Sequence, residues 1–286
     1  MLTNGKVLLD IANKHNFAIP AFNISDYAML NGIFEISEEM KAPLIVAIHP
    51  DELHHIGSEV MSSIIAKAHK ASVPVIIHYD HGTTYEHMME SIQTGFTSAM
   101  IDGSLLSFDE NVDITKRTVD ALKLVNISVE GELGTIGAND SYGEAGAAEI
   151  IYTKPSDARI FIEKTGVDSL AIAIGTSHGL YPINVKPKLR IDLLREIKGD
   201  LGIPLVLHGG SSNAEEELAE AVKYGINKIN ISSDIKVAYQ DKMREVLGNK
   251  KLREPNAIQP ECIKAMKKVA REKIELFNAD GKADLY

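Results

Sequence analysis

Residues 73–82, VPVIIHYDHG, are a short run of mostly β-branched apolar side chains that ends in a polar cluster. Nearly continuous apolar character, without strict alternation, is typical of strands buried on both faces in parallel α/β sheets. The chain contains seven other runs of this kind, and they are FAIPAFNI from Phe17, PLIVAIHP from Pro43, TSAMIDGS from Thr97, ISVEGELG from Ile127, DSLAIAIG from Asp168, IPLVLHGG from Ile203 and KINISSD from Lys228. Their starts lie roughly 25 to 40 residues apart, which leaves room for a strand, a loop and a helix each.

The segments between these runs have the pattern of helices. Residues 25–40 place apolar side chains at helical spacing, and residues 211–217 offer capping residues before an acidic first turn. Residues 259–277 alternate charged and apolar side chains as a final helix would. Eight βα units predict a single-domain α/β chain, residues 1–286, folded as a (β/α)8 TIM barrel with a C-terminal helical extension. An open doubly wound sheet is the alternative fold. Such folds usually have a glycine-rich nucleotide-binding loop after the first strand, and the first predicted strand of this chain is not followed by one.

Composition limits the classes of function. A length of 286 residues with 44% hydrophobic side chains suits one large domain. A net charge of −10 disfavours nucleic acid and anionic membranes as partners, so we expect neither. The chain has one cysteine, Cys262, and its first residues lack the apolar stretch of a signal peptide, so we expect a cytoplasmic setting.

Three histidines stand where apolar runs end, and each is followed by a glycine. They are His81, His178 and His208. Catalytic groups in a TIM barrel lie at the carboxyl ends of the strands, so the fold would bring these three imidazoles to one rim. Three protein nitrogens with an open fourth position are typical of a catalytic zinc site. The sequence therefore predicts a metal site at this rim.

The other histidines are interpreted differently. A lone histidine is more often a satisfied structural residue than a ligand. His54 and His55, in a predicted helix, and His15 and His69, among lysines, are expected at the surface. His78 lies inside an apolar run and is expected in the core.

Acidic residues also stand at the carboxyl ends of predicted strands. Asp80 directly precedes His81, where an acid or base within reach of a substrate would be most useful. Asp102 follows TSAMI and Glu132 lies in VEGELG. Either carboxylate could orient a histidine ligand or hold a second metal position, and Asp102 could instead cap the following helix.

Two loops have the composition of phosphate sites. HGGSSN at residues 208–213 and NISSD at residues 230–234 offer small side chains, backbone amides and hydroxyls before helices. The loops after the seventh and eighth strands of TIM barrels commonly bind phosphate. Serine-rich turns are common, so it is the pair of loops together that predicts a phosphate site at this rim.

In the order PAFNI, HYDHG, MIDGS, VEGELG, SLAIAIGTSHG, PLVLHGGS and GINKINISSD, the chain resembles the class II, zinc-dependent fructose- and tagatose-bisphosphate aldolase family. The resemblance implies a lyase that splits a ketose phosphate into dihydroxyacetone phosphate and an aldehyde. It implies zinc on His81, His178 and His208, with Asp102 and Glu132 at a second divalent position or around the first, and a monovalent cation near the phosphate. Asp80 would be the acid/base at the C4 hydroxyl. The implied substrate-binding residues are Asn23, Gly179, Gly209, Gly210, Ser211, Asn230, Ser232 and Ser233.

The resemblance also implies a loop acid that protonates C3. The loop here reads IGANDSYGE, which makes Asp140 the nearest match and Glu144 its rival. Other departures fall on the aldehyde side: His49 replaces a Ser or Thr, and Arg253 is out of register with the family's late arginine. Ser212 stands where the family usually has glycine.

Three alternatives stay open. A ketose-1-phosphate aldolase of sugar-acid or polyol breakdown would keep the dihydroxyacetone phosphate half and lack the second phosphate. A zinc hydrolase could activate water on three histidines, although His-x-His pairs are common there and residues 78–80 read His-Tyr-Asp. A non-catalytic partner subunit is the third alternative. We expect a homodimer or homotetramer that acts on a small sugar phosphate.

Overall fold

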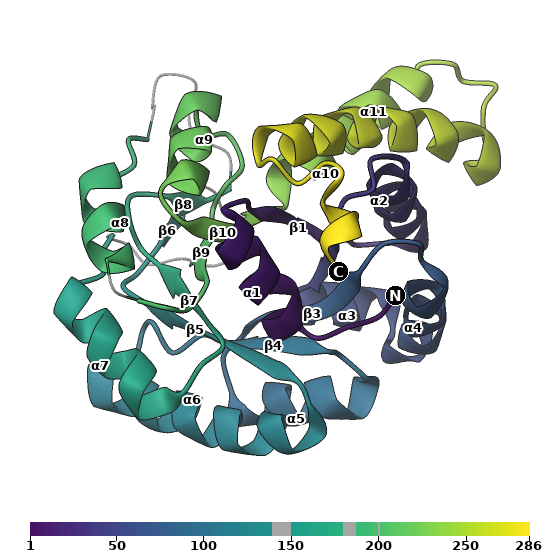
Figure 1. Ribbon diagram of the computed structural model, residues 1–286. Coiled ribbons are helices and arrows are strands. Elements are labelled where there is room, and N and C mark those ends of the chain that lie inside the picture. The colour runs from purple at the N-terminus through teal and green to yellow at the C-terminus, as the bar shows by residue number, and fades with distance from the viewer. Residues whose placement is uncertain (139–149, 180–186, 200) are drawn as a thin grey trace.

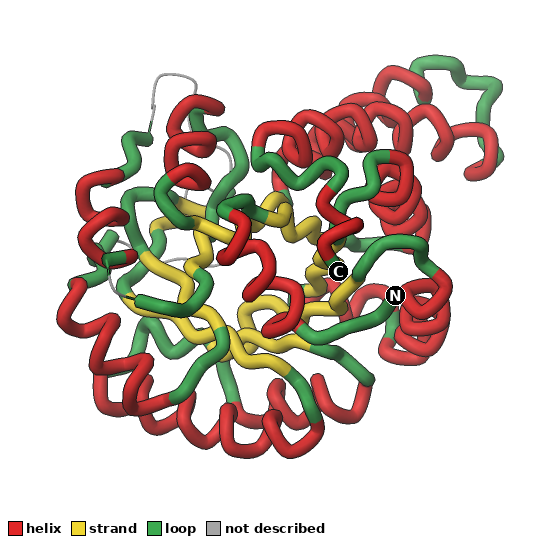
Figure 2. Tube along the Cα trace, viewed as in Figure 1, coloured by secondary structure: helices red, strands yellow, loops and turns green. Residues whose placement is uncertain are grey.

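The structure, a computed structural model, describes residues 1–138, 150–179, 187–199 and 201–286. Eight strands form a closed ring of parallel pairs in the order β1-β10-β9-β7-β5-β4-β3-β2 (Figure 2). The strands are β1 (Ile19–Asn23), β2 (Leu44–Ile48), β3 (Val75–Gly82), β4 (Ser98–Ile101), β5 (Ser128–Leu133), β7 (Ser169–Ile172), β9 (Leu205–Leu207) and β10 (Ile226–Ile231). Seven lie within the predicted apolar runs and β10 begins two residues before its run, at Ile226, so the predicted barrel is confirmed.

Helices surround this ring and cover the outer faces of the strands (Figures 1 and 2). They are α2 (Tyr27–Glu39), α3 (Pro50–Ile56), α4 (Met61–Lys70), α5 (Tyr85–Thr94), α6 (Phe108–Leu122), α7 (Pro155–Thr165), α8 (Ile191–Lys198), α9 (Glu215–Lys223), α10 (Ser233–Val246) and α11 (Pro255–Leu276). The three segments predicted as helices correspond to α2, α9 and α11. The start of α9 differs in detail: its N-cap is Ala214, without a side-chain cap, followed by acidic residues 215–217.

Two features were not predicted. Helix α1 (Gly5–His15), capped by the Asn4 side chain, covers the end of the barrel where the strands begin (Figure 1). The amide of Gly5 donates to Ser128 Oγ at 2.9 Å, at the first residue of β5. At the opposite end, β6 (Gly137–Ala138) and β8 (Ser177–His178) form a small parallel sheet outside the barrel.

The C-terminal helices extend the barrel beside β1. Helices α10 and α11 pack against each other and project from the ring, and α11 also packs on α2 (Figure 1). A Cβ at Gly32 of α2 would lie 2.6 Å from Met266 Cε and 2.8 Å from Ile263 Cγ2, so α11 packs closely against the backbone of α2. The predicted helical extension is confirmed.

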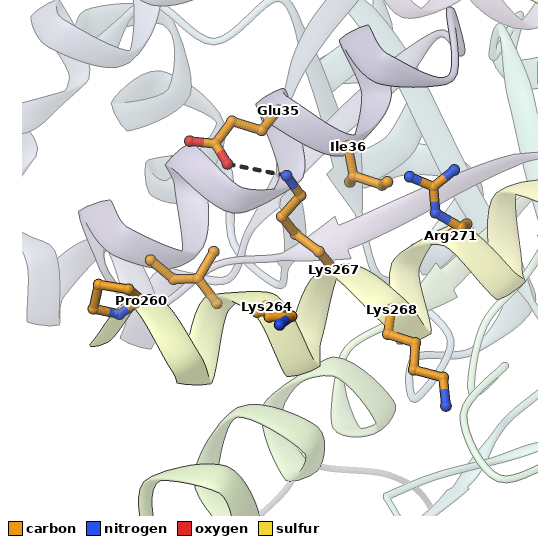
Figure 3. Close-up of a pocket in the computed structure, with 8 residues that line it drawn as sticks. Glu35, Ile36, Pro260, Lys264, Lys267, Lys268 and Arg271 are labelled. Carbon is orange, nitrogen blue, oxygen red and sulfur yellow. Dashed lines mark hydrogen bonds and ion pairs between the residues drawn. The ribbon is translucent and has the colours of Figure 1, made fainter. Parts of the chain in front are cut away.

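A groove of about 510 Å³ lies between α2 and α11 (Figure 3). Its basic side chains are Lys264, Lys267, Lys268 and Arg271. Two of them are already paired, because Lys267 contacts Glu35 and Glu39 at 3.1 and 2.6 Å, and Arg271 contacts Glu39 at 3.0 Å. These ion pairs join α11 to α2.

The described helices include none that is both long enough and apolar enough to cross a membrane.

Candidate active site

Polar side chains of three barrel strands meet inside the ring in two layers. Successive side chains of a strand point to opposite faces, so residues two apart share a face. The layer nearer the carboxyl ends contains Asp80, Glu132 and Asn230, and the layer beneath it contains His78, Glu130 and Lys228. All six are buried. Barrel interiors are usually filled by branched apolar residues, so two polar layers mark this end of the barrel as functional.

The three predicted metal histidines converge at the carboxyl end. Ligand atoms of His81, His178 and His208 all lie within 4.8 Å of one another, and the three residues are buried. His81 ends β3, His178 lies in β8 and His208 follows β9. His81 has a φ of 53°, in the left-handed region that few non-glycine residues adopt. Such strain is typical of functional positions, where surrounding contacts hold the backbone in place.

Two carboxylates fix which nitrogen of each ring faces the cluster. His81 Nδ1 lies 3.0 Å from Asp102 Oδ2, and His208 Nε2 lies 2.8 Å from Glu130 Oε1. An ionised carboxylate only accepts hydrogen bonds, so both of these nitrogens carry the proton and donate it. The lone pairs therefore lie on Nε2 of His81 and Nδ1 of His208.

These two lone-pair nitrogens face each other at 2.7 Å. Two such atoms repel unless a cation lies beside both. Burial lowers the pKa of His208 to about 4, so protonation of His208 is disfavoured near neutral pH. A metal ion bound to the three imidazoles fits this donor set, because a metal-bound histidine usually donates its other N–H to a carboxylate or carbonyl.

Asp80 lies beside this cluster with two amide groups directed at it. Asn23 Nδ2 donates to Oδ2 at 3.0 Å, and Asn230 Nδ2 donates to Oδ1 at 3.0 Å. Burial would raise the pKa of the Asp80 carboxyl, but the charge of His81 and then of Lys228 holds this pKa well below its usual range. Asp80 is therefore a fixed, ionised carboxylate that can accept a proton from a group placed next to it.

Asp102 and Glu132 have opposite electrostatics although both adjoin His81. Burial would raise the pKa of Asp102, but the hydrogen bond from His81 lowers it below its usual range. Burial raises the pKa of Glu132 well above its usual range, and Asp102 adds to the rise. Ligand atoms of His81, Asp102 and Glu132 also lie within 4.8 Å of one another, and the two carboxylates are the atoms of this group that can hold a second cation. The cap of α6 is Ser107, so Asp102 is not the helix cap considered as an alternative.

The two loops predicted to bind phosphate lie side by side. The amide of Asp234 donates to Ser211 Oγ at 3.2 Å, and the amide of Ser212 donates to Asp234 Oδ1 at 3.0 Å. Ser232 is the N-cap of α10 and Ser233 its first residue, so backbone amides of this helix start lie at the same edge. Ser212 has a φ of 60°, which explains why glycine would suit this position.

The glycines next to His208 have structural reasons of their own. Gly209 has a φ of 64°, and a Cβ there would lie 2.5 Å from the carbonyl oxygen of Ser177. A Cβ at Gly210 would lie 2.4 Å from Ile229 Cγ2. Gly179 directly follows His178 and has a φ of 83°. Side chains at Gly209 and Gly210 would therefore disturb the fold as well as any ligand.

The remaining predicted residues are Asp140, Glu144, His49 and Arg253. Asp140 and Glu144 lie outside the described residues. His49 caps α3, with its ring 6.5 Å from that of His81. Arg253 lies between α10 and α11, 85% exposed and paired with Glu254 at 3.1 Å.

The structure confirms the predicted exposure of the histidines that were not assigned to the metal site. His15, His54, His55 and His69 are exposed, and His78 is buried as expected. His78 is not an inert core residue, however, because its Nδ1 lies 2.8 Å from Ser98 Oγ and its Nε2 lies 3.1 Å from Lys228 Nζ.

Sequence reasoning missed three buried charged residues. Glu130 and Lys228 form an ion pair at 2.8 Å beneath the histidines. Glu52 accepts hydrogen bonds from Asn23 Nδ2 at 3.3 Å and from Lys236 Nζ at 2.6 Å. Glu130 and Lys228 could have been found from the alternation of side chains along a strand. They precede the predicted site residues Glu132 and Asn230 by two positions and therefore point to the same face of the sheet.

The buried histidines predict a loss of stability in acid for the metal-free protein. Burial, aided by the charge of Lys228, lowers the pKa of His78 to about 3, and that of His208 falls to about 4. The unfolded chain titrates near its ordinary value of 6.5 and so binds these protons first as pH falls. The melting temperature should therefore decrease from about pH 6.5 down to about pH 4. Glu132, with its raised pKa, offsets part of this loss.

Thermal unfolding in chelator across this pH range measures the effect, and His78→Gln should flatten the curve. A melting temperature that does not change between neutral pH and about pH 4.5 would contradict the prediction.

Comparison with known proteins places these features in context. The family model described as fructose-bisphosphate aldolase class-II matches residues 3–282. A fructose-bisphosphate aldolase from Thermus caldophilus is 35% identical over 305 aligned positions, covering 99% of this chain and 100% of the relative. The crystal structure of the YdjI aldolase from Escherichia coli matches with a TM-score of 0.88 and 34% identity, covering 99% of this chain and 100% of that one. A putative fructose-1,6-bisphosphate aldolase from Coccidioides immitis matches with a TM-score of 0.89 and 26% identity, covering 99% of each chain.

Proposed function

Because this chain belongs to the class II fructose-bisphosphate aldolase family, we propose that it is a zinc-dependent enzyme that reversibly cleaves a ketose phosphate to dihydroxyacetone phosphate and an aldehyde. The observation that carries the proposal is the convergence of His81, His178 and His208 beside the buried carboxylate of Asp80. When bound, zinc would supply a Lewis acid that stabilises the charge developing on the substrate carbonyl oxygen as the C3–C4 bond breaks.

Asp80 is the proposed base for the C4 hydroxyl. Its two oxygens are held by the amides of Asn23 and Asn230, so the carboxylate cannot turn away from the histidine cluster. Oδ1 of each asparagine has no hydrogen-bond partner among the described residues, which leaves both oxygens able to accept substrate hydroxyls. Proton transfer at C3 is proposed for Asp140, with Glu144 as the alternative.

The phosphate of the dihydroxyacetone half is proposed to bind between the two adjoining loops. Gly179, Gly209, Gly210 and Ser211 would line one side, and Ser232 and Ser233 at the start of α10 the other. A helix start presents free N–H groups and the positive end of its dipole to an anion. A monovalent cation near this phosphate would complete the site, and the carboxylates of Asp102 and Glu132 would hold a second divalent ion.

A second candidate differs only in the aldehyde half, and two observations favour it. Arg253 is exposed and paired with Glu254, and the end of β2 is occupied by His49, whose Nδ1 accepts the amide of Asp51 at 3.2 Å. Neither residue offers this subunit a cation for a second phosphate. The alternative substrate is a ketose-1-phosphate derived from a sugar acid or polyol. A non-catalytic partner role is not supported, because His81, His178, His208 and Asp80 are all present.

The substrate assay that separates the two candidates also tests the function. Release of dihydroxyacetone phosphate should be measured for a panel of ketose monophosphates and bisphosphates. We expect bisphosphates to be mediocre substrates, because an unpaired second phosphate gains no charge-assisted hydrogen bonds. A bisphosphate that exceeds every monophosphate by more than about a hundredfold in kcat/KM, or about 2.7 kcal/mol, would contradict this and point to Arg253. No release from any ketose phosphate would overturn the proposed function.

We also propose that residues 1–286 form one domain, that the chain assembles as a homodimer or homotetramer, and that it acts in the cytoplasm. The reduced and buried Cys262 suits that compartment. Light scattering on the purified chain would give the subunit number.

A further inference from the structure

We propose that Lys228 is a positioning residue that fixes the metal-binding face of His208 through Glu130. This inference rests on the proposed zinc site and concerns a side chain that lies one layer below it. Lys228 does not adjoin the proposed substrate and has no part in the proton transfers described above. It is a fully buried lysine in the interior of a barrel.

The contacts form a chain from the lysine to the histidine. Lys228 Nζ donates to Glu130 Oε1 at 3.0 Å and to Oε2 at 2.8 Å, so both oxygens of the carboxylate are held. Glu130 Oε1 then accepts the Nε2 proton of His208 at 2.8 Å. The lone pair of His208 is thereby left on Nδ1, the atom that faces His81.

A second set of contacts holds the lysine itself. Nζ lies 3.1 Å from His78 Nε2, and His78 Nδ1 lies 2.8 Å from Ser98 Oγ. Three strands on different sides of the barrel therefore fix the ammonium group: β10 supplies it, β5 the carboxylate and β3 the imidazole. A carboxylate clamped in this way cannot rotate away from His208.

The energy of such a pair argues for a role other than stability. Removing two charges from water costs more than their attraction usually returns, and apolar residues of similar volume often stabilise a protein as well or better. Branched apolar residues are the common filling of a TIM barrel. A charged pair at this depth, directly beneath a histidine ligand, is better explained by its effect on that ligand.

The experiment uses Lys228→Met, Glu130→Gln and the double variant, all of nearly unchanged volume. Lys198→Met is the control, because Lys198 is a partly buried lysine that hydrogen-bonds to Asn13 Oδ1 and the Ile203 carbonyl near the start of β9. For each full-length protein, the zinc dissociation constant is measured by competition with a chromophoric chelator. The melting temperature of the metal-free form and the visible spectrum of the cobalt form are recorded alongside.

We expect Lys228→Met to weaken zinc binding by about 10- to 100-fold, the usual cost of losing a group that orients a ligand. The cobalt spectrum should change as well. Lys198→Met should lower the melting temperature without either effect. The double variant should recover stability, since it leaves no unpaired buried charge, while its zinc affinity stays low.

Zinc affinities and cobalt spectra within twofold of wild type in the folded variants would overturn the inference. If no variant folds, the wild-type protein decides: nitrogen NMR of labelled histidine should show the proton of His208 on Nε2, and a proton on Nδ1 would refute the scheme. Wild-type protein that binds no zinc would instead refute the proposed function.

Discussion

Replacing Asp80 with alanine is expected to leave the metal content unchanged and to slow aldol cleavage by about 10² to 10⁴, the usual contribution of a positioned acid or base. The reason lies in the geometry of the carboxylate. It is buried, ionised and held by the amides of Asn23 and Asn230, so its oxygens are fixed where they can accept a proton. It does not belong to the three-histidine group, so zinc should remain bound without it.

The measurement is kcat and kcat/KM for the best substrate, with zinc content determined on the same preparation. Asp80→Asn keeps the volume and should be nearly as slow as the alanine variant, because an amide cannot accept the proton. Asp168→Asn is the control, since this carboxylate accepts the amide of Val129 at the opposite end of the barrel. If Asp80→Ala loses less than about tenfold, the proton is taken by another group.

The barrel could be predicted because its signal is local. Each strand is a short apolar run such as residues 75–77, and each polar rim residue follows such a run directly. The spacing of the runs then gives the number of βα units. Helix α1 was missed because it precedes the first strand and therefore falls outside the βα repeat. The sheet of β6 and β8 was missed because two-residue strands carry no periodicity.

The candidate site was predicted in its upper layer only. His81, Asp80 and Asn230 were chosen because they end strands, whereas Glu130 and Lys228 lie one step inward and looked like parts of the runs. The ion pair between them joins strands 98 residues apart, and no local pattern indicates such a partner. The sequence also does not predict the electrostatics of Glu130 and Glu132, which are two residues apart. Burial would raise the pKa of Glu130, but the charge of Lys228 and the hydrogen bond from His208 together lower it, whereas burial raises the pKa of Glu132.

Removing the metal is expected to abolish activity, and adding zinc or cobalt should restore it. No other group among the described residues of the cluster can supply the positive charge that the reaction needs at the carbonyl oxygen. Lys228 is buried one layer below and is engaged with Glu130 and His78. Loss of a metal that stabilises developing charge costs several kcal/mol, which corresponds to about a thousandfold or more in rate.

His178→Ala is the sharpest variant for this prediction, because its effect on the fold should be small. His178 lies in β8, outside the barrel, whereas His208 is buried in the barrel and its removal would also take away a hydrogen bond to the buried carboxylate of Glu130. We expect His178→Ala to lose zinc and activity together while its melting temperature in chelator stays near that of the wild type. His54→Ala, an exposed histidine of α3, is the control and should keep both metal and activity. Full activity in excess chelator, with no metal detectable in the protein, would show that cleavage does not depend on this site.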